Sequence, residues 1–130
     1  MWRKDKPLDV LIGSSSQFKG DLLTKGVARI DGSIEGNLQA DFVIVGESGK
    51  IKGNVQSRGV IVDGKIEGNI EAQEVTEIRS HGEVMGDIRT AKLVISEGGI
   101  FEGHSYMKAL REEERKDVVS IEDRVTKKKE

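Results

Sequence analysis

The sequence predicts an all-β fold, a single-stranded parallel β-helix of triangular cross-section with about six turns. Three observations support this prediction. A seven-residue phrase recurs along the chain, its central glycine returns every 15 to 18 residues, and apolar residues alternate with polar ones within each segment. A near-constant period of this kind is typical of stacked repeats, in which one repeat buries its apolar side chains against the next.

The recurrent phrase reads glycine, polar, aliphatic, polar, glycine, asparagine, aliphatic in residues 32–38, 49–55 and 64–70. Looser copies occupy residues 16–22, 82–88 and 99–105. Because Gly-Asn and Gly-Asp mark turns, each copy predicts a short strand followed by a corner. The central glycines of the six copies are Gly20, Gly36, Gly53, Gly68, Gly86 and Gly103.

Three sets of inward side chains are predicted, one on each side of the triangle. The first set precedes each central glycine by two residues: Phe18, Ile34, Ile51, Ile66, Val84 and Phe101. The second follows by two: Leu22, Leu38, Val55, Ile70, Ile88 and polar Ser105. The third is Ile12, Ile30, Val45, Val62, Ile78 and Ile95, each with Val10, Ala28, Val43, Val60, Thr76 or Leu93 two residues earlier. Such short strands bury all three sets only if equivalent strands stack in parallel.

The outward residue before each central glycine supports the same register. Its charge alternates in sign over the first four turns, and the full column is Lys19, Glu35, Lys52, Glu67, Met85 and Glu102. Opposite charges on stacked strands stabilise each pair by a few tenths of a kcal/mol. Lys50 above Lys65 does not follow this pattern.

Composition limits the classes of function. At 130 residues the chain is one domain, with 4% aromatic residues and a thin aliphatic core expected. A net charge of −2 argues against a nucleic-acid binder, and the absence of cysteine excludes disulfides and thiolate chemistry. No apolar run approaches the ~20 residues of a membrane span and no signal peptide is visible, so a cytoplasmic protein is predicted.

No catalytic, cofactor-binding or metal-binding residues are predicted. His81 and His104 fall at different points of their repeats, so both are interpreted as exposed corner residues. The residue that follows each of the first five central glycines could offer an oxygen ligand to a metal ion: Asp21, Asn37, Asn54, Asn69 and Asp87. Only the two ends of this column are charged, and the preference of Asn and Asp for turns explains it without a metal. No phosphate-binding glycine motif occurs, so no nucleotide is expected.

Two other functions stay open at this point. A hexapeptide-repeat acyltransferase is also a β-helix, with a catalytic histidine. Its turns are regular at about 18 residues, whereas the spacing here drifts between 15 and 18. The second alternative is a β-helix that binds a partner without polymerising.

The chain divides into a β-helix over residues 8–107 and two tails. Residues 108–130 are rich in Glu, Lys and Arg and are predicted to be mostly disordered. Residues 1–7 form a short tail that is either frayed or a weak interfacial membrane anchor. The residues of that anchor would be Met1, Trp2, Arg3, Lys4 and Lys6.

The two ends of a parallel β-helix are predicted to be contact surfaces. Each end presents unpaired backbone groups over an apolar core, and soluble β-helices usually cover them. Too few residues precede Leu8 for a capping helix, so Val10, Ile12 and Phe18 are expected at one open face and Ile100 and Phe101 at the other. Association of like ends would hide both faces in a non-polar filament. Alternatively, residues 106–110 fold back as a cap and leave at most a dimer.

Residues 8–105 resemble the bactofilins, bacterial polymer-forming cytoskeletal proteins. The resemblance rests on the sixfold phrase, the closing Gly-Ile-Phe-Glu-Gly of residues 99–103, and the short charged tails. It implies a right-handed three-sided β-helix that assembles end to end into non-polar filaments without nucleotide. It also implies a scaffold for cell-shape or cell-wall proteins at the inner face of the cytoplasmic membrane. Phe101 matches a family phenylalanine that supports polymerisation, and residues 1–4 resemble the family's membrane-binding segment.

Overall fold

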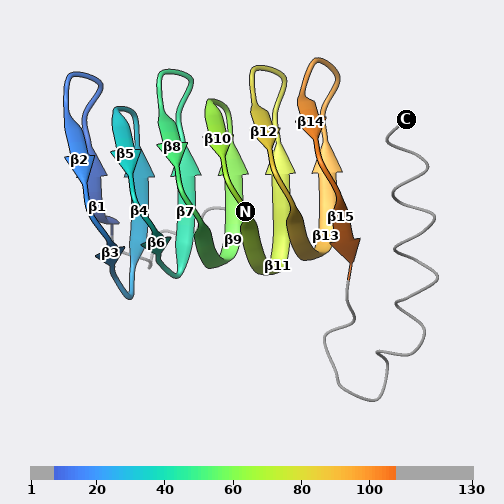
Figure 1. Cartoon of the computed structure of the whole chain (residues 1–130), viewed down its shortest axis with the longest axis horizontal. Coiled ribbons are helices and arrows are strands. Elements are labelled where there is room, and N and C mark those ends of the chain that lie inside the picture. The colour runs from blue at the N-terminus through green and yellow to red at the C-terminus, as the bar shows by residue number, and fades with distance from the viewer. Residues whose placement is uncertain (1–7, 108–130) are drawn as a thin grey trace.

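Fifteen short strands wind into six stacked turns in the computed structural model of the chain, which describes residues 8–107 (Figure 1). Every strand pairing is parallel. Each turn crosses three faces in the same order, which we number 1 to 3 from β1 onward. The predicted all-β parallel solenoid is therefore confirmed, and residues 8–107 contain no helix.

Face 2 is a separate sheet of six three-residue strands. Each strand contributes one inward side chain between two outward ones, since its middle residue alone points to the core. These strands are β2 (Gln17–Lys19), β5 (Ser33–Glu35), β8 (Lys50–Lys52), β10 (Lys65–Glu67), β12 (Glu83–Met85) and β14 (Ile100–Glu102).

Faces 1 and 3 belong to one sheet, which folds around the corner between them. At the N-terminal end each face has its own short strands. Face 1 has β1 (Leu8–Ile12), β4 (Val27–Ile30) and β7 (Phe42–Val45) in the first three turns. Face 3 has β3 (Leu22–Leu23) and β6 (Leu38–Gln39) in the first two turns. Later strands cross from face 3 into the next turn's face 1: β9 (Val55–Val62), β11 (Ile70–Ile78) and β13 (Ile88–Ile95). The chain then reaches β15 (Ser105–Met107) on face 3.

The bend within the long strands differs from the separate corners that the sequence predicts. The register shifts between Ala72 and Val75, where β11 turns from one face to the next. The small side chains Ser57, Ala72 and Thr90 stack at this point and are buried. Because they occupy little space near the axis, the strand bends here without a loop.

The three predicted inward sets are in register throughout the solenoid. Phe18 stacks on Ile34, which stacks on Ile51, and the other sets follow the same rule. In the middle turns these side chains are fully buried, with Ile30, Ile51 and Ile66 at 0% exposure. The core is a column of aliphatic rings along the solenoid axis.

The corner between faces 2 and 3 requires glycine. The six central glycines all have positive φ, from +130° to +148°. A Cβ atom at Gly53 would also collide with the carbonyl oxygen of Gly36 in the preceding turn. Consecutive turns therefore approach so closely that no side chain fits between them.

The residue after each central glycine links consecutive turns. The side-chain oxygen of Asn37 accepts the backbone N–H of Asn54 at 3.2 Å, and that of Asn54 accepts the N–H of Asn69 at 3.1 Å. Asp21 and Asn69 make the same contact at 3.1 Å. The column was predicted to serve local turns, but its side chains bond along the solenoid axis instead.

The corners between faces 1 and 2 alternate in length over the first five turns. Four-residue loops follow β1, β7, β11 and β13, and two-residue loops follow β4 and β9. The longer loops extend visibly beyond the shorter ones (Figure 1). Most of the variation in repeat length is thus absorbed at these corners, and β11 carries one further residue between Ala72 and Val75, where its register shifts.

Candidate functional site

The first turn leaves one edge of each of its strands open. Within residues 8–107, β1, β2 and β3 each pair with one neighbour, the equivalent strand of the second turn. Its inward side chains Val10, Ile12, Phe18 and Leu22 are only partly buried. Open strand edges beside an apolar ring are a template on which further strands can pair.

The last turn has the same construction at the opposite end. β14 and β15 each pair with one neighbour within the described residues, and Leu93, Ile95 and Phe101 are partly buried. Ser105 is buried, and its hydroxyl has no hydrogen-bond partner among these residues. Tyr106 and Met107 extend face 3, with the Arg89 guanidinium 4.8 Å from the Tyr106 ring centroid. The alternative prediction was that residues 106–110 fold back as a cap. Tyr106 and Met107 instead continue the sheet, and residues 108–110 lie outside the described residues.

The large apolar side chains that are exposed in the described part of the chain all lie in these two end turns. They are Leu8 at 45%, Leu11 at 58% and Leu23 at 71% in the first turn, and Ile100 at 47% in the last. The four middle turns contribute none, although they carry the same repeat. Exposed apolar surface is therefore concentrated where the stack of turns ends.

The predicted contact residues fall into two separate groups. Val10, Ile12 and Phe18 lie in the first turn, and Phe101 lies in the last, with four turns between them. Ile100 points outward from face 2 rather than into the end of the core. Each group can thus contact another molecule but cannot contact the other group within one chain.

Sequence reasoning missed three contact candidates at the first turn, namely Leu8, Leu11 and Leu23. Leu11 and Leu23 occupy outward positions next to inward residues, where the strand alternation predicts a polar side chain. The runs Val10-Leu11-Ile12 and Leu22-Leu23 break that alternation. This break was the signal that could have identified them.

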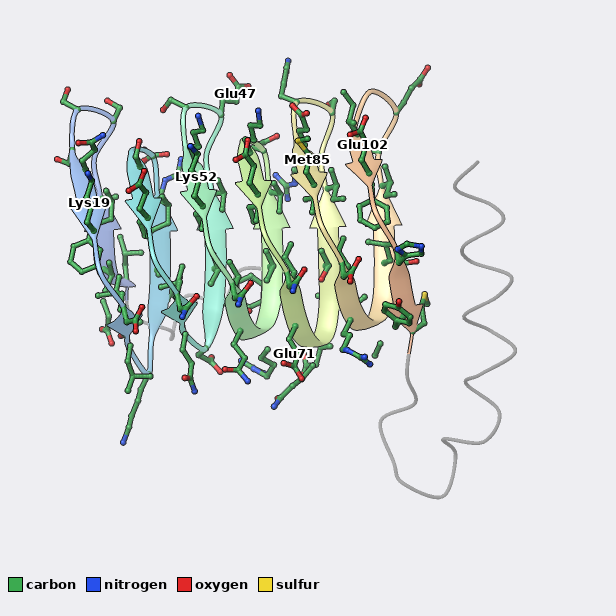
Figure 2. All side chains as sticks on the ribbon, viewed as in Figure 1. Lys19, Glu47, Lys52, Glu71, Met85 and Glu102 are labelled. Carbon is green, nitrogen blue, oxygen red and sulfur yellow. The ribbon has the colours of Figure 1, made fainter. Side chains whose placement is uncertain are left out.

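The charged column on face 2 gives the two ends opposite charges. Lys19 marks the first turn and Glu102 the last, and both lie in one row with Lys52 and Met85 (Figure 2). The Lys19 ammonium lies 3.8 Å from the Glu35 carboxylate, with both side chains more than half exposed. Exposed pairs of this kind contribute little stability.

The histidines lie in different corners and form no common site. His81 Nδ1 is 3.2 Å from a carboxylate oxygen of Glu47 in the loop after β7, and His104 Nδ1 is 3.6 Å from that of Asp87. Each imidazole is about two thirds exposed. Both imidazoles therefore lie at exposed corners of separate turns.

The predicted membrane-binding residues Met1, Trp2, Arg3, Lys4 and Lys6 lie outside the described residues, as does the tail of residues 108–130. Residues 8–107 contain no helix long and apolar enough to cross a membrane.

Comparison with known families supports the resemblance noted in the sequence. The bactofilin family model, described as polymer-forming cytoskeletal, matches residues 10–106. The chain belongs to the bactofilin family. That match covers nearly all of the solenoid, including both end turns, so the open ends described above are part of the family domain.

Two curated bactofilins of Myxococcus xanthus (strain DK1622) are similar to this one. BacP is 33% identical over 96 residues, which are 73% of this chain and 40% of BacP. BacO is 27% identical over 97 residues, 74% of this chain and 77% of BacO. The bactofilin described here thus spans less than half of the length of BacP. No solved structure matches it.

Proposed function

We propose that this bactofilin is a non-enzymatic cytoskeletal scaffold that assembles end to end into filaments without nucleotide. The supporting observation is that the two end turns carry the open strand edges and the exposed large apolar side chains of the described residues. Burying them against a second copy continues the core column and the strand ladders from one molecule into the next.

The repeat itself supports end-to-end growth. In solenoids that stay monomeric, the terminal repeats usually present a polar outer face. Here the first turn presents Val10, Ile12, Phe18 and Leu22, and the last presents Leu93, Ile95 and Phe101. Both ends therefore offer an apolar ring of the kind that a stacked turn covers in the middle of the solenoid.

Assembly in this proposal needs no energy source. Burial of apolar side chains and pairing of backbone groups are favourable in themselves, so no bound nucleotide is required to drive growth. The sequence likewise contains no phosphate-binding glycine motif. Filaments should therefore form from purified protein in nucleotide-free buffer.

The proposed location is the inner face of the cytoplasmic membrane, where the filament would organise cell-shape or cell-wall proteins. Trp2 is suited to the headgroup region, and Arg3, Lys4 and Lys6 to anionic lipid. One such segment binds only marginally, but a filament presents many copies together. Pelleting with anionic liposomes should fall when residues 1–6 are removed, and equal pelleting of the shortened and full chains would contradict membrane contact.

Replacing one inward residue at the end tests the assembly. Phe101→Arg should leave small folded species, because an arginine in the last ring cannot be buried against a second copy. Met85→Arg is the matched control, since Met85 points outward on the same face one turn earlier. Ultracentrifugation and negative-stain electron microscopy should show filaments for the wild type and Met85→Arg only. Filaments of Phe101→Arg at the wild-type protein concentration would contradict the assigned contact.

A further inference from the structure

Face 1 is the most apolar of the three outer surfaces. Its central outward column contains four apolar residues among six: Leu11, Arg29, Ile44, Ile61, Glu77 and Val94. Of the four, Leu11 is exposed, and Ile44, Ile61 and Val94 are half-buried but point outward. The corresponding column of face 3 is mostly polar: Leu23, Gln39, Gln56, Glu71, Arg89 and Tyr106. Face 2 carries Lys, Glu, Gln or Ser at ten of its twelve outward positions, Met85 and Ile100 being the exceptions.

Two ion pairs flank the centre of face 1 in opposite order. In the second turn Arg29 Nε lies 3.0 Å from an Asp31 carboxylate oxygen, so the cation precedes the anion along the chain. In the fifth turn Arg79 Nε lies 3.4 Å from a Glu77 carboxylate oxygen, so the anion precedes the cation. Their side chains are 25% to 48% exposed and are accessible to another molecule.

This order makes face 1 complementary to itself. A two-fold axis along the strand direction turns a second solenoid upside down and keeps its strands parallel to those of the first. The first turn then faces the sixth, the second the fifth, and the third the fourth. The facing pairs are Leu11 with Val94, Arg29 with Glu77, Ile44 with Ile61, and Asp31 with Arg79.

We infer that face 1 is a lateral docking surface for a second copy of this chain, packed antiparallel, with Ile44 and Ile61 at the centre and two ion pairs on each side. Under this symmetry every apolar residue of the central column meets an apolar residue, and each charge of the two ion pairs meets its opposite. An isologous contact of this kind repeats the same patch on both copies.

The parallel arrangement of two solenoids is less favourable. With its two-fold axis over the central column, it would place Arg29 against Arg29 and Glu77 against Glu77. With the axis between the central column and the next, it would place Arg29 against Asp31 of the other copy, which pairs opposite charges. However, it would set Ile61 against Asp63 and Val94 against Ser96, because the column of residues 13, 31, 46, 63, 79 and 96 would face the central one. An aliphatic side chain facing a carboxylate desolvates the charge without a partner. The antiparallel arrangement avoids this contact.

The area of face 1 indicates when the contact forms. Strand geometry gives a surface of about 16 Å by about 29 Å, or roughly 450 Å² per copy. Stable pairs usually bury about 800 Å² per partner. Single molecules should therefore not pair through face 1, whereas filaments align many copies at once. The inference thus rests on the proposed polymerisation and predicts paired filaments in which each molecule faces an antiparallel molecule of the other filament.

The test exchanges the charges of one ion pair at a time in the full-length chain. Glu77→Arg with Arg79→Glu keeps the pair within each molecule but brings the guanidinium introduced at position 77 toward Arg29 of the other copy. This variant should show at least tenfold fewer paired filaments by negative-stain electron microscopy, with single filaments unchanged. Arg29→Glu with Asp31→Arg should have the same effect. Combining all four substitutions, or mixing the two variants, should restore pairing, since each charge again meets its opposite.

Each outcome bears on a specific part of the inference. Single wild-type filaments, or pairing unchanged in both charge-exchanged variants, would overturn lateral docking or its antiparallel order while leaving end-to-end assembly intact. No filaments of any kind would overturn the proposed function together with this inference. Ile61→Lys provides a second variant and should also separate the filaments. If it instead leaves pairing unchanged and alters only pelleting with anionic vesicles, face 1 contacts lipid and the inference is wrong.

Discussion

The four middle turns and the two end turns share one sequence repeat but differ in how far they bury it. Ile30, Val45, Val62 and Ile78 are at 0% exposure in the middle, whereas Ile12 and Ile95 of the same column are only partly buried at the ends. The difference arises from the number of neighbouring turns, because the residue types are equivalent. A turn of this solenoid is complete only between two others, and each end turn has one such neighbour among the described residues.

The largest expected effect compares the same substitution at a middle and an end glycine. Gly53→Ala should destabilise the fold by more than about 3 kcal/mol, because a Cβ there strains the backbone and collides with the Gly36 carbonyl. At Gly20, whose Cβ would contact only the Phe18 ring at 4.0 Å, alanine should add the backbone strain alone, about 1–3 kcal/mol. Thermal unfolding followed by circular dichroism measures both. Equal losses would show that the preceding turn does not matter.

The second prediction concerns the polarity of the end contacts. If like ends meet, Phe18→Arg and Phe101→Arg each block one end and should both form dimers through the other. If unlike ends meet, each variant alone should be monomeric and a mixture should form heterodimers. Analytical ultracentrifugation of the separate variants and of the mixture distinguishes the two. We expect dimers from each variant, and monomers would contradict the non-polar filament.

A smaller effect is expected from the axial hydrogen bonds at the corner after face 2. Asn54 accepts the N–H of Asn69 and donates its own N–H to Asn37, whereas His104 in the last turn only donates its N–H, to Asp87 at 3.4 Å. Asn54→Ala should lower the free energy of unfolding by about 1 kcal/mol, and His104→Ala by less than about 0.5 kcal/mol. Denaturant unfolding measures the difference. An equal loss at both positions would argue against a contribution from the axial bond.

The middle turns were predictable from the sequence and the ends were less so, for a physical reason. Ile34, Ile51 and Ile66 recur at fixed distances from a glycine, and a periodic pattern specifies both strand and register. Leu11 and Leu23 do not follow the period, so their role depends on which strands lack a neighbour. The Arg29–Asp31 and Glu77–Arg79 ion pairs have opposite orders along the chain. Their complementarity cannot be recognised from the sequence, because it depends on the second and fifth turns lying on one face at equal distances from its centre.

The bent strands show a second limit of pattern reasoning. Ser57, Ala72 and Thr90 are small and recur at one point of each repeat, a pattern that by itself suggests a corner between separate strands. In the structure the strand continues through them, because small side chains permit a bend without interrupting the backbone pairing. Composition alone does not distinguish these two outcomes. The turn signal of Gly-Asn is stronger, since a positive φ demands glycine.

The one expected effect of opposite sign concerns a polar atom inside the middle turns. Thr76 is fully buried between Val60 and Leu93, and its hydroxyl has no hydrogen-bond partner within residues 8–107. Thr76→Val keeps the shape and removes an unsatisfied group, so it should raise the free energy of unfolding by about 1 kcal/mol. Thr90→Val is the matched control, because the Thr90 hydroxyl donates to the Lys92 carbonyl at 3.2 Å and its loss should be neutral or destabilising. If Thr76→Val lowers the denaturant midpoint as much as Thr90→Val does, the Thr76 hydroxyl is satisfied in solution and the middle turns are less dry than their burial indicates.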